Sequence, residues 1–191
     1  MQKAVLPEGV HHLPLQPHDD ARGRVLEMFR QEWPDVGWPF IQWNLVRSGA
    51  RVFRGVHLHL AHADYLVLVA GEMTIGLKDL RAGSPSEGAT ALITMREDAP
   101  SALVIPPGVA HGFLFREPSI HAYAVSRYWD PANELGCHWQ DQELGIPWPI
   151  APAEVATYCL SSRDAQLPGL SRVAPQIPRY RSADAPLEEP A

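Results

Sequence analysis

The stretch Phe53-Arg54-Gly55-Val56-His57-Leu58-His59-Leu60 combines one arginine and two histidines with aliphatic residues. Successive side chains of a β-strand point to opposite faces of the sheet, so His57 and His59 share one face and the aliphatic residues around them share the other. The aliphatic face predicts burial in a core, and the imidazole face predicts the floor of a pocket. The alternative interpretation is a pair of solvated surface histidines.

Short predicted strands continue in both directions from this stretch. We expect them at residues 21–29, 41–47, 51–60, 65–70, 73–80, 89–95, 102–105, 111–115 and 120–128. Turn signals separate them, among them Gly71 and Pro106-Pro107-Gly108, and none shows a ten-residue helical period. This pattern is typical of an all-β protein, either a closed barrel or a double-sheet jelly roll of the cupin type.

The length of 191 residues suffices for one domain with extensions. The 19 prolines, many of them near the ends, predict irregular arms around a compact centre. We divide the chain into an N-terminal arm at 1–20, a jelly-roll domain at 21–150 and a C-terminal arm at 151–191. The C-terminal arm is expected to carry a short helix at 153–160 and to be poorly ordered from about residue 175.

Composition excludes several partners. The net charge is −6 without a Lys/Arg block, which argues against nucleic acid, while a few placed arginines can still bind an anionic small ligand. No apolar run reaches membrane-spanning length, so we expect no membrane association. The two cysteines form no CxxC motif, and the first residues lack the basic and apolar segments of a secretion signal. We therefore expect a reducing, cytoplasmic setting.

Four residues have the spacing of a metal site: His57-x-His59, then Asp64, and later His111 after Pro107-Gly108. Imidazole and carboxylate ligands suit divalent first-row transition metals. The spacing resembles the two-part metal signature of the cupin family, in which glutamate usually stands at the place of Asp64. This resemblance implies a metal-dependent isomerase or oxygenase. The alternative is that Asp64 lies in a hairpin loop without a ligand role.

A second set of fragments covers roughly residues 18–165. In order they are Ala21-Arg22-Gly23, Glu27, Gln42-x-Asn44, Phe53-Arg54-Gly55-Val56-His57, Asp79-Leu80-Arg81, Ser84-Pro85, residues 105–113, Tyr123, Tyr128, Glu134, Trp139-x-Asp141, residues 145–149 and Leu160-Ser161-x-x-Asp164. Together they resemble the dTDP-4-dehydrorhamnose 3,5-epimerase family, which shares the cupin-like barrel. The resemblance implies an isomerase of deoxysugar biosynthesis that epimerises a nucleotide-diphospho-4-keto-6-deoxysugar without a required cofactor, and it implies a homodimer.

The same resemblance implies roles for individual residues. His57 would be the base that removes a proton next to the ketone, Asp141 would orient its ring, and Tyr123 would return a proton from the opposite face. The remaining implied residues all bind substrate, with the arginines suited to the diphosphate: Arg22, Glu27, Gln42, Asn44, Arg54, His111 and Tyr128. Strict alternation puts Arg54 and His57 on opposite faces, so a shared pocket requires a β-bulge at Gly55.

Two positions depart from the family pattern. His59 replaces an aromatic residue or glutamine, and Asp64 replaces a lysine beside the developing enolate oxygen. A carboxylate there repels an enolate, whereas a bound divalent cation reverses the sign. However, a His57 that ligates a metal has no lone pair on that nitrogen to act as the base.

Three hypotheses therefore remain open. The first is a metal-free epimerase that uses His57, Asp141 and Tyr123. The second is a cupin enzyme with a divalent transition metal on His57, His59, Asp64 and His111. The third is a non-catalytic barrel that binds a sugar nucleotide.

Overall fold

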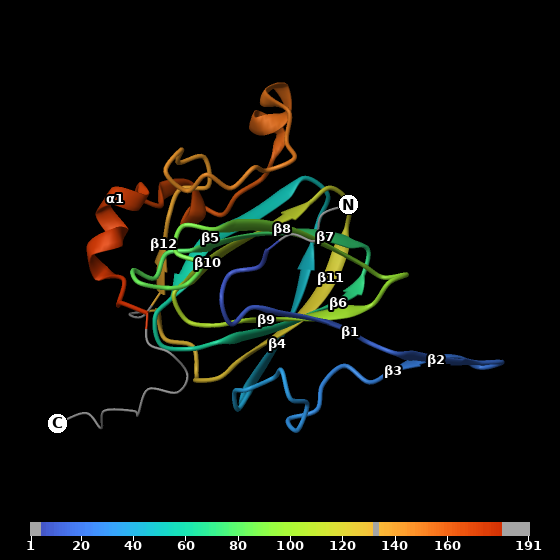
Figure 1. Cartoon of the computed structure of the whole chain (residues 1–191). Coiled ribbons are helices and arrows are strands. Elements are labelled where there is room, and N and C mark those ends of the chain that lie inside the picture. Colours follow the sequence, from blue (N-terminus) through green and yellow to red (C-terminus); the bar gives the residue numbers. More distant parts are fainter. Residues whose placement is uncertain (1–4, 132–133, 181–191) are drawn as a thin grey trace.

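The computed structural model describes residues 5–131 and 134–180, and almost all of its regular structure is β (Figure 1). The strands are β1 (His11–Pro14), β2 (Pro17–Asp20), β3 (Gly23–Leu26), β4 (Gln42–Ser48), β5 (Val52–His59), β6 (Asp64–Ala70), β7 (Glu72–Asp79), β8 (Thr90–Arg96), β9 (Ser101–Ile105), β10 (Val109–Phe115), β11 (Ser119–Val125) and β12 (Glu134–Gly136). Short helical pieces follow: the 3₁₀ helices η2 (Pro152–Thr157), η3 (Asp164–Gln166) and η4 (Ala174–Gln176), and the helix α1 (Leu170–Val173).

Two antiparallel five-stranded sheets face each other (Figure 1). One has the order β1-β9-β6-β11-β4 and the other has the order β12-β5-β10-β7-β8. Neighbours in the sheets are mostly distant in sequence, as in a double-sheet jelly roll. The all-β, jelly-roll prediction is confirmed. Strands β2 and β3 form a separate two-stranded hairpin that projects away from the sandwich (Figure 1).

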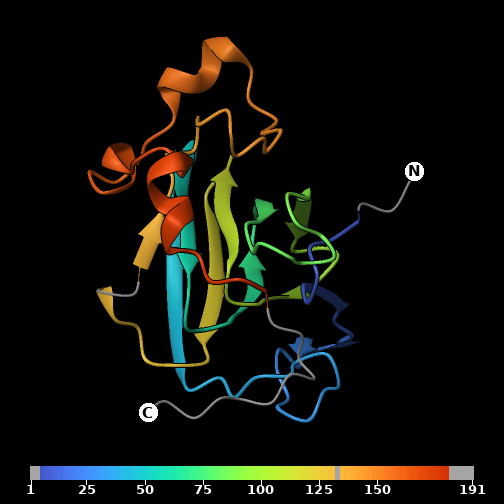
Figure 2. The same cartoon turned by 60° about the vertical axis from the view of Figure 1, so that its left-hand side comes forward.

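Apolar residues pack on both faces of the two sheets, and β9 and β10 are buried along their whole length. Between the sheets, inward-facing residues of β6 to β10 form one core, including Leu66, Ile75 and Phe115. On the outer face of the second sheet, Phe53 and Leu58 pack under the C-terminal segment, so α1 lies against this sheet (Figure 2). On the outer face of the first sheet, residues 13–40 cover a third core.

The predicted bulge at Gly55 is present. His111 pairs with His57 and Phe113 pairs with Arg54, so β5 has one residue more than β10 in this interval. Gly55 has φ +102°, and a Cβ there would lie 2.9 Å from the carbonyl oxygen of His111. Glycine is therefore required both by the backbone angle and by the close approach of β10. The bulge places Arg54 and His57 in the same cavity.

The ends of the chain differ from the predicted arms. The segment 1–20 contains β1, which pairs with β9 along four residues and extends the first sheet. The helix expected at 153–160 is the 3₁₀ helix η2. Of the tail expected to be poorly ordered, residues 181–191 lie outside the described part of the chain. Within residues 5–131 and 134–180, none of the helices has the length and hydropathy needed to span a bilayer.

Candidate active site

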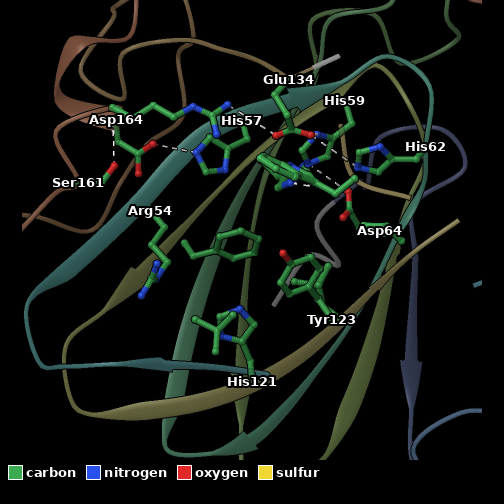
Figure 3. A pocket seen from close by; sticks show the side chains of 17 residues that line it. Arg54, His57, His59, His62, Asp64, His121, Tyr123, Glu134, Ser161 and Asp164 are labelled. Atoms are coloured by element: carbon green, nitrogen blue, oxygen red, sulfur yellow. Dashed lines mark hydrogen bonds and ion pairs between the residues drawn. The ribbon is translucent and has the colours of Figure 1, made fainter. Parts of the chain in front are cut away.

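A cavity of about 300 Å³ opens between the two sheets (Figure 3). Its walls come from β4, β5, β6, β10, β11 and β12, together with the segment before η3. Seventeen residues line it: Val46, Arg54, His57, His59, His62, Asp64, Leu66, His111, Phe113, His121, Tyr123, Val125, Trp129, Glu134, Ser161, Arg163 and Asp164. Eight of them are histidines or acids, which come from both sheets, and Tyr123 lies on β11, in the sheet opposite to that of His57 (Figure 3).

At one end of the cavity, His57 pairs with Asp164. His57 Nε2 lies 2.9 Å from Asp164 Oδ1, and the other carboxylate oxygen accepts a hydrogen bond from the backbone N–H of Gly55 at 3.2 Å. Ser161 Oγ accepts the backbone N–H of Asp164 and fixes the start of η3. Burial alone would raise the pKa of Asp164, but the hydrogen bond and charge of His57 and the Gly55 N–H outweigh it and lower the pKa. We call His57 and Asp164 the dyad.

The dyad replaces the predicted pair of His57 and Asp141. Asp141 Oδ2 accepts the backbone N–H of Leu170 at 2.7 Å, and its Oδ1 accepts that of Glu143 at 2.8 Å. Asp141 therefore holds a loop against the start of α1 and does not line the cavity. The bulge at Gly55 explains the correction, because it presents both the His57 ring and the Gly55 N–H to η3.

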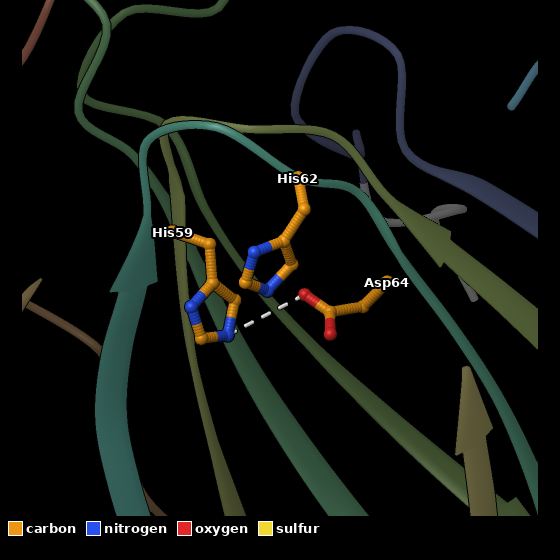
Figure 4. Close-up of side chains that lie close together, drawn as sticks. All are labelled: His59, His62 and Asp64. Carbon is orange, nitrogen blue, oxygen red and sulfur yellow. Dashed lines mark ion pairs between the residues drawn. The ribbon is translucent and has the colours of Figure 1, made fainter. Parts of the chain in front are cut away.

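At the other end of the cavity lies a group of buried side chains that we call the histidine–carboxylate cluster: His59, His62, Asp64, His111 and Glu134. Figures 3 and 4 both show His59, His62 and Asp64 of this cluster. Asp64 Oδ2 lies 3.5 Å from His59 Nε2 and 3.8 Å from His111 Nε2. Glu134 Oε1 lies 2.8 Å from His59 Nδ1 and 3.9 Å from His62 Nε2. The 2.8 Å contact is within ion-pair distance but lacks hydrogen-bond geometry, so among residues 5–131 and 134–180 neither His59 Nδ1 nor Glu134 Oε1 has a hydrogen-bond partner.

Burial dominates the electrostatics of the cluster. Desolvation, reinforced by the charge of Glu134, raises the pKa of Asp64 well above its ordinary value. Desolvation also lowers the pKa values of His59 and His111 well below the ordinary value, with neighbouring histidines as the second cause. The protein alone therefore favours neutral imidazoles here and disfavours the charge of Asp64.

Tyr123 and Arg54 stand on opposite sheets of the cavity (Figure 3). Burial raises the pKa of Tyr123, and the charges of Asp64 and Glu134 add to this, so the phenol keeps its proton at neutral pH. Arg54 donates a hydrogen bond from Nε to Ser48 Oγ at 3.0 Å. Beside it, burial lowers the pKa of His121 to about 4. The cavity thus offers an arginine on the same strand as His57 and a protonated phenol on the opposite sheet.

Five predicted substrate-binding residues do not line the cavity of the single chain. Gln42 Oε1 accepts the backbone N–H of the cavity residue Trp129, and Gln42 Nε2 donates to Asn44 Oδ1, but neither Gln42 nor Asn44 lines the cavity. Tyr128 is 74% exposed. The other two, Arg22 and Glu27, lie on or next to the β2–β3 hairpin and form surface ion pairs with Asp20 and Arg30. Arg54 and His111 are at the cavity as predicted.

The four predicted metal ligands, His57, His59, Asp64 and His111, do not form one group in the structure. Nε2 of His57 is engaged with Asp164, while His59, Asp64 and His111 lie within the cluster. The ring of His62 stacks on that of His59 with centroids 4.2 Å apart, and His62 was not among the predicted ligands. In this geometry His57 and the cluster are separate groups.

Sequence reasoning missed the roles of several cavity residues: His62, His121, Glu134, Ser161, Arg163 and Asp164. The signal for Asp164 was present in the fragment Leu160-Ser161-x-x-Asp164, although nothing in the sequence links it to β5. His62 was visible only as one more local histidine. Glu134 enters through β12, which pairs with the edge of β5.

A family model described as dTDP-4-dehydrorhamnose 3,5-epimerase matches residues 6–172, which is most of the chain and includes both ends of the cavity. The chain belongs to the dTDP-4-dehydrorhamnose 3,5-epimerase family. The resemblance predicted from the sequence is thereby confirmed, together with its function class, an isomerase of deoxysugar biosynthesis.

Curated relatives agree with this assignment. The dTDP-4-dehydrorhamnose 3,5-epimerase of Pseudomonas aeruginosa is 33% identical over 154 residues, which cover 77% of this chain and 83% of that protein. The dTDP-4-dehydrorhamnose 3-epimerase of Streptomyces niveus is 31% identical over 188 residues, which cover 93% of this chain and 88% of that protein. The family thus includes enzymes named for one carbon and enzymes named for two.

Solved structures of epimerases share the fold. The 3,5-epimerase of Legionella pneumophila in complex with dTDP-4-keto-L-rhamnose has a TM-score of 0.84 at 27% identity, covering 94% of this chain and 97% of that one. The 3′-monoepimerase of Streptomyces bikiniensis in complex with dTDP-quinovose has a TM-score of 0.81 at 29% identity, covering 93% and 92%. Both were solved with dTDP-sugar ligands.

Proposed function

We propose that this epimerase inverts a carbon next to the ketone of a dTDP-4-keto-6-deoxysugar, with His57 as the base, Asp164 as its partner and Tyr123 as the acid. One observation carries the proposal: His57 and Tyr123 stand on opposite sheets of one cavity. Removal of a proton on one side and its return on the other is what inversion of a carbon requires.

The dyad geometry suits the first step. When Nε2 of His57 donates its hydrogen to Asp164, the lone pair of the neutral ring is on Nδ1. The ketone acidifies the neighbouring C–H bond, so Nδ1 can take the proton while the bonding electrons move into the enolate. The resulting imidazolium is stabilised by the Asp164 carboxylate, whose own charge is kept by the Gly55 N–H.

Tyr123 suits the second step. Because its pKa is raised by burial and by the nearby carboxylates, the phenol holds a proton that it can donate to the enolate carbon. Donation from the β11 side restores the ketone with the opposite configuration. Water then returns protons to the tyrosine and removes them from His57, so no cofactor is consumed.

We propose that Arg54 contacts the diphosphate and that a second copy of the chain supplies Arg22 and Glu27. The β2–β3 hairpin projects from the sandwich with Arg22 87% exposed, which leaves both residues free to reach another subunit. Trp43 and Leu45 on the edge strand β4, and Ile41 just before it, are also exposed. An exposed apolar strip on an edge strand favours association, so a homodimer stays our prediction, as does a cytoplasmic location.

The decisive experiment is incubation of the tag-free protein with dTDP-4-keto-6-deoxyglucose in D₂O, with and without chelator. NMR and mass spectrometry locate the deuterium. We expect deuterium at C3, C5 or both, at the same rate with and without chelator. Binding of the sugar nucleotide without exchange would instead support the non-catalytic barrel. Exchange that chelator abolishes, and that metal restores, would support the metal-dependent cupin enzyme.

A further inference from the structure

The histidine–carboxylate cluster is a buried polar group of the cavity that the proton-transfer mechanism does not use. His59, His62 and Asp64 are 8%, 4% and 4% exposed. One ligand atom of each of these three residues lies within 4.8 Å of the other two (Figure 4). Tetrahedral coordination with bonds of about 2.1 Å separates ligand atoms by about 3.4 Å, so small side-chain rotations would close this set.

In the cluster, a hydrogen-bond acceptor of His111 lies next to a carboxylate oxygen of Asp64, which is also an acceptor. His111 Nδ1 lies 3.2 Å from the carbonyl oxygen of Val109, and a hydrogen bond there requires the proton on Nδ1. This leaves the lone pair on Nε2, which lies 3.8 Å from Asp64 Oδ2, and two acceptors attract each other only through a proton or a cation. His59 Nε2 approaches the same oxygen at 3.5 Å. Among the described residues, no lysine or arginine forms an ion pair with Asp64.

Buried atoms without partners point to the same place. Within the described residues, His59 Nδ1, His62 Nε2 and Glu134 Oε1 are buried and have no hydrogen-bond partner. Glu134 places a second carboxylate beside the rings of His59 and His62. Among the described residues, the one arginine or lysine in ion-pair distance of Glu134 is Arg163, at 3.7 Å. Buried polar atoms are normally satisfied, and both of these imidazole nitrogens lie within 3.9 Å of Glu134 Oε1, so the cluster as a whole lacks a positive partner.

We infer that His59, His62 and Asp64 bind a divalent first-row transition metal, with Glu134 beside His59 as the carboxylate that orients its ring. Imidazole and carboxylate donors suit Zn²⁺, Co²⁺, Ni²⁺ or Fe²⁺, and they do not suit Mg²⁺ or Ca²⁺, which prefer oxygen ligands alone. A carboxylate behind a ligating histidine is the usual outer partner in such sites. Neither His57 nor Asp164 belongs to the site, so the proposal does not rest on the proposed epimerase mechanism.

The test measures binding and not turnover. Tag-free, chelator-stripped full-length protein is titrated by calorimetry with Zn²⁺ and, separately, with Mg²⁺, and Co²⁺ is followed by its visible absorption. We expect one equivalent of Zn²⁺ to bind, no response to Mg²⁺, and a Co²⁺ spectrum typical of a site with nitrogen ligands. Failure of the wild-type protein to bind Zn²⁺ would overturn the inference without affecting the test of epimerase activity.

Variants locate the site. His62→Gln and Asp64→Asn should each weaken Zn²⁺ binding at least tenfold, while His57→Asn and the surface control His18→Gln should bind as the wild type does. A thermal melt without metal checks that each variant folds, and Zn²⁺ should raise the melting temperature of the wild type but not of His62→Gln. If His57→Asn loses the metal and His62→Gln keeps it, the ligand set proposed here is wrong.

Discussion

The pKa values of the two buried aspartates at opposite ends of the cavity are shifted in opposite directions. Asp164 and Asp64 are both 4% exposed. Asp164 accepts hydrogen bonds from His57 and from the Gly55 N–H, and its pKa is lowered. Asp64 faces imidazole nitrogens and Glu134, and its pKa is raised well above the ordinary value. At the same solvent exposure the two pKa values shift in opposite directions, because Asp64 lies deeper in the protein and lacks the hydrogen-bond donors that Asp164 has.

This difference separates two chemistries within one cavity. The dyad end supplies its own stabilisation for a carboxylate and an imidazolium, which is what a base needs. The cluster end has an excess of acceptors and needs a proton or a cation from outside. The following predictions test that separation, from the largest expected effect on turnover to the smallest.

Replacing His57 should have the largest effect. His57→Asn removes the proposed base, and general base catalysis typically contributes about 10²–10⁴-fold. We expect kcat/KM for the 4-keto sugar nucleotide to fall by about 10³-fold, measured in a continuous NMR assay. Binding of dTDP, measured by calorimetry, should change little and serves as the control. Retention of more than about a tenth of the activity would contradict the role of His57.

Tyr123→Phe should separate exchange from inversion. Without the phenolic proton, the enolate formed by His57 is reprotonated mainly from the side on which it was formed. We expect epimer formation to fall by about 10²-fold while solvent deuterium still enters the recovered substrate. Loss of exchange and inversion to the same extent would show that Tyr123 is not the acid on the opposite face.

Asp164→Asn and Asp141→Asn form a matched pair. Asp164→Asn should lower kcat/KM by about 10²-fold and the free energy of unfolding by about 2 kcal/mol, since it removes a charged hydrogen bond to His57. Asp141→Asn should leave kcat/KM nearly unchanged, because the Asp141 carboxylate accepts hydrogen bonds from Glu143 and Leu170 and does not line the cavity. The reverse result would restore Asp141 as the residue that orients His57.

The stability effect of Asp164 should depend on pH in a defined direction. Its pKa in the folded protein lies below the ordinary value of 3.8, so the folded state binds the proton less readily than the unfolded state. The stabilisation is therefore present above pH 3.8 and lost as pH falls through the lowered folded pKa. Urea unfolding should show the wild type and Asp164→Asn converging in acid; a constant difference would contradict this explanation.

Asp64→Asn should have the smallest effect on turnover of the chelator-treated protein, less than about tenfold. Its free energy of unfolding without metal should stay the same or rise by about 1 kcal/mol, since a buried carboxylate without a cationic partner is costly. Urea unfolding of chelator-treated protein measures this. A loss as large as that of Asp164→Asn would show that the two ends of the cavity are alike.

The sequence predicts most of the fold and half of the site, for identifiable reasons. Alternating hydrophobicity and turn residues locate the strands. Strict alternation would put Arg54 and His57 on opposite faces of the sheet, so a shared pocket predicts the bulge at Gly55. The partner of His57 could not be predicted, because Asp164 reaches β5 across 107 residues through a three-residue 3₁₀ helix without periodicity.

The membership of the histidine–carboxylate cluster could not be predicted from the sequence either. Spacing alone grouped His57 with His59, because a strand puts them on one face. The structure separates them because Asp164 engages one ring and Asp64 approaches the other. His62 lies in the loop after β5, outside any strand, so the alternation of side chains along a strand does not predict where it points.

The central claim is that His57 transfers a proton and binds no metal. It is tested most directly by deuterium incorporation into dTDP-4-keto-6-deoxyglucose by chelator-stripped wild-type protein and by His57→Asn under identical conditions. We expect rapid incorporation next to the ketone by the metal-free wild type and a loss of about 10³-fold in His57→Asn. Absence of exchange in the metal-free wild type, with recovery on addition of Zn²⁺ or Co²⁺, would contradict it.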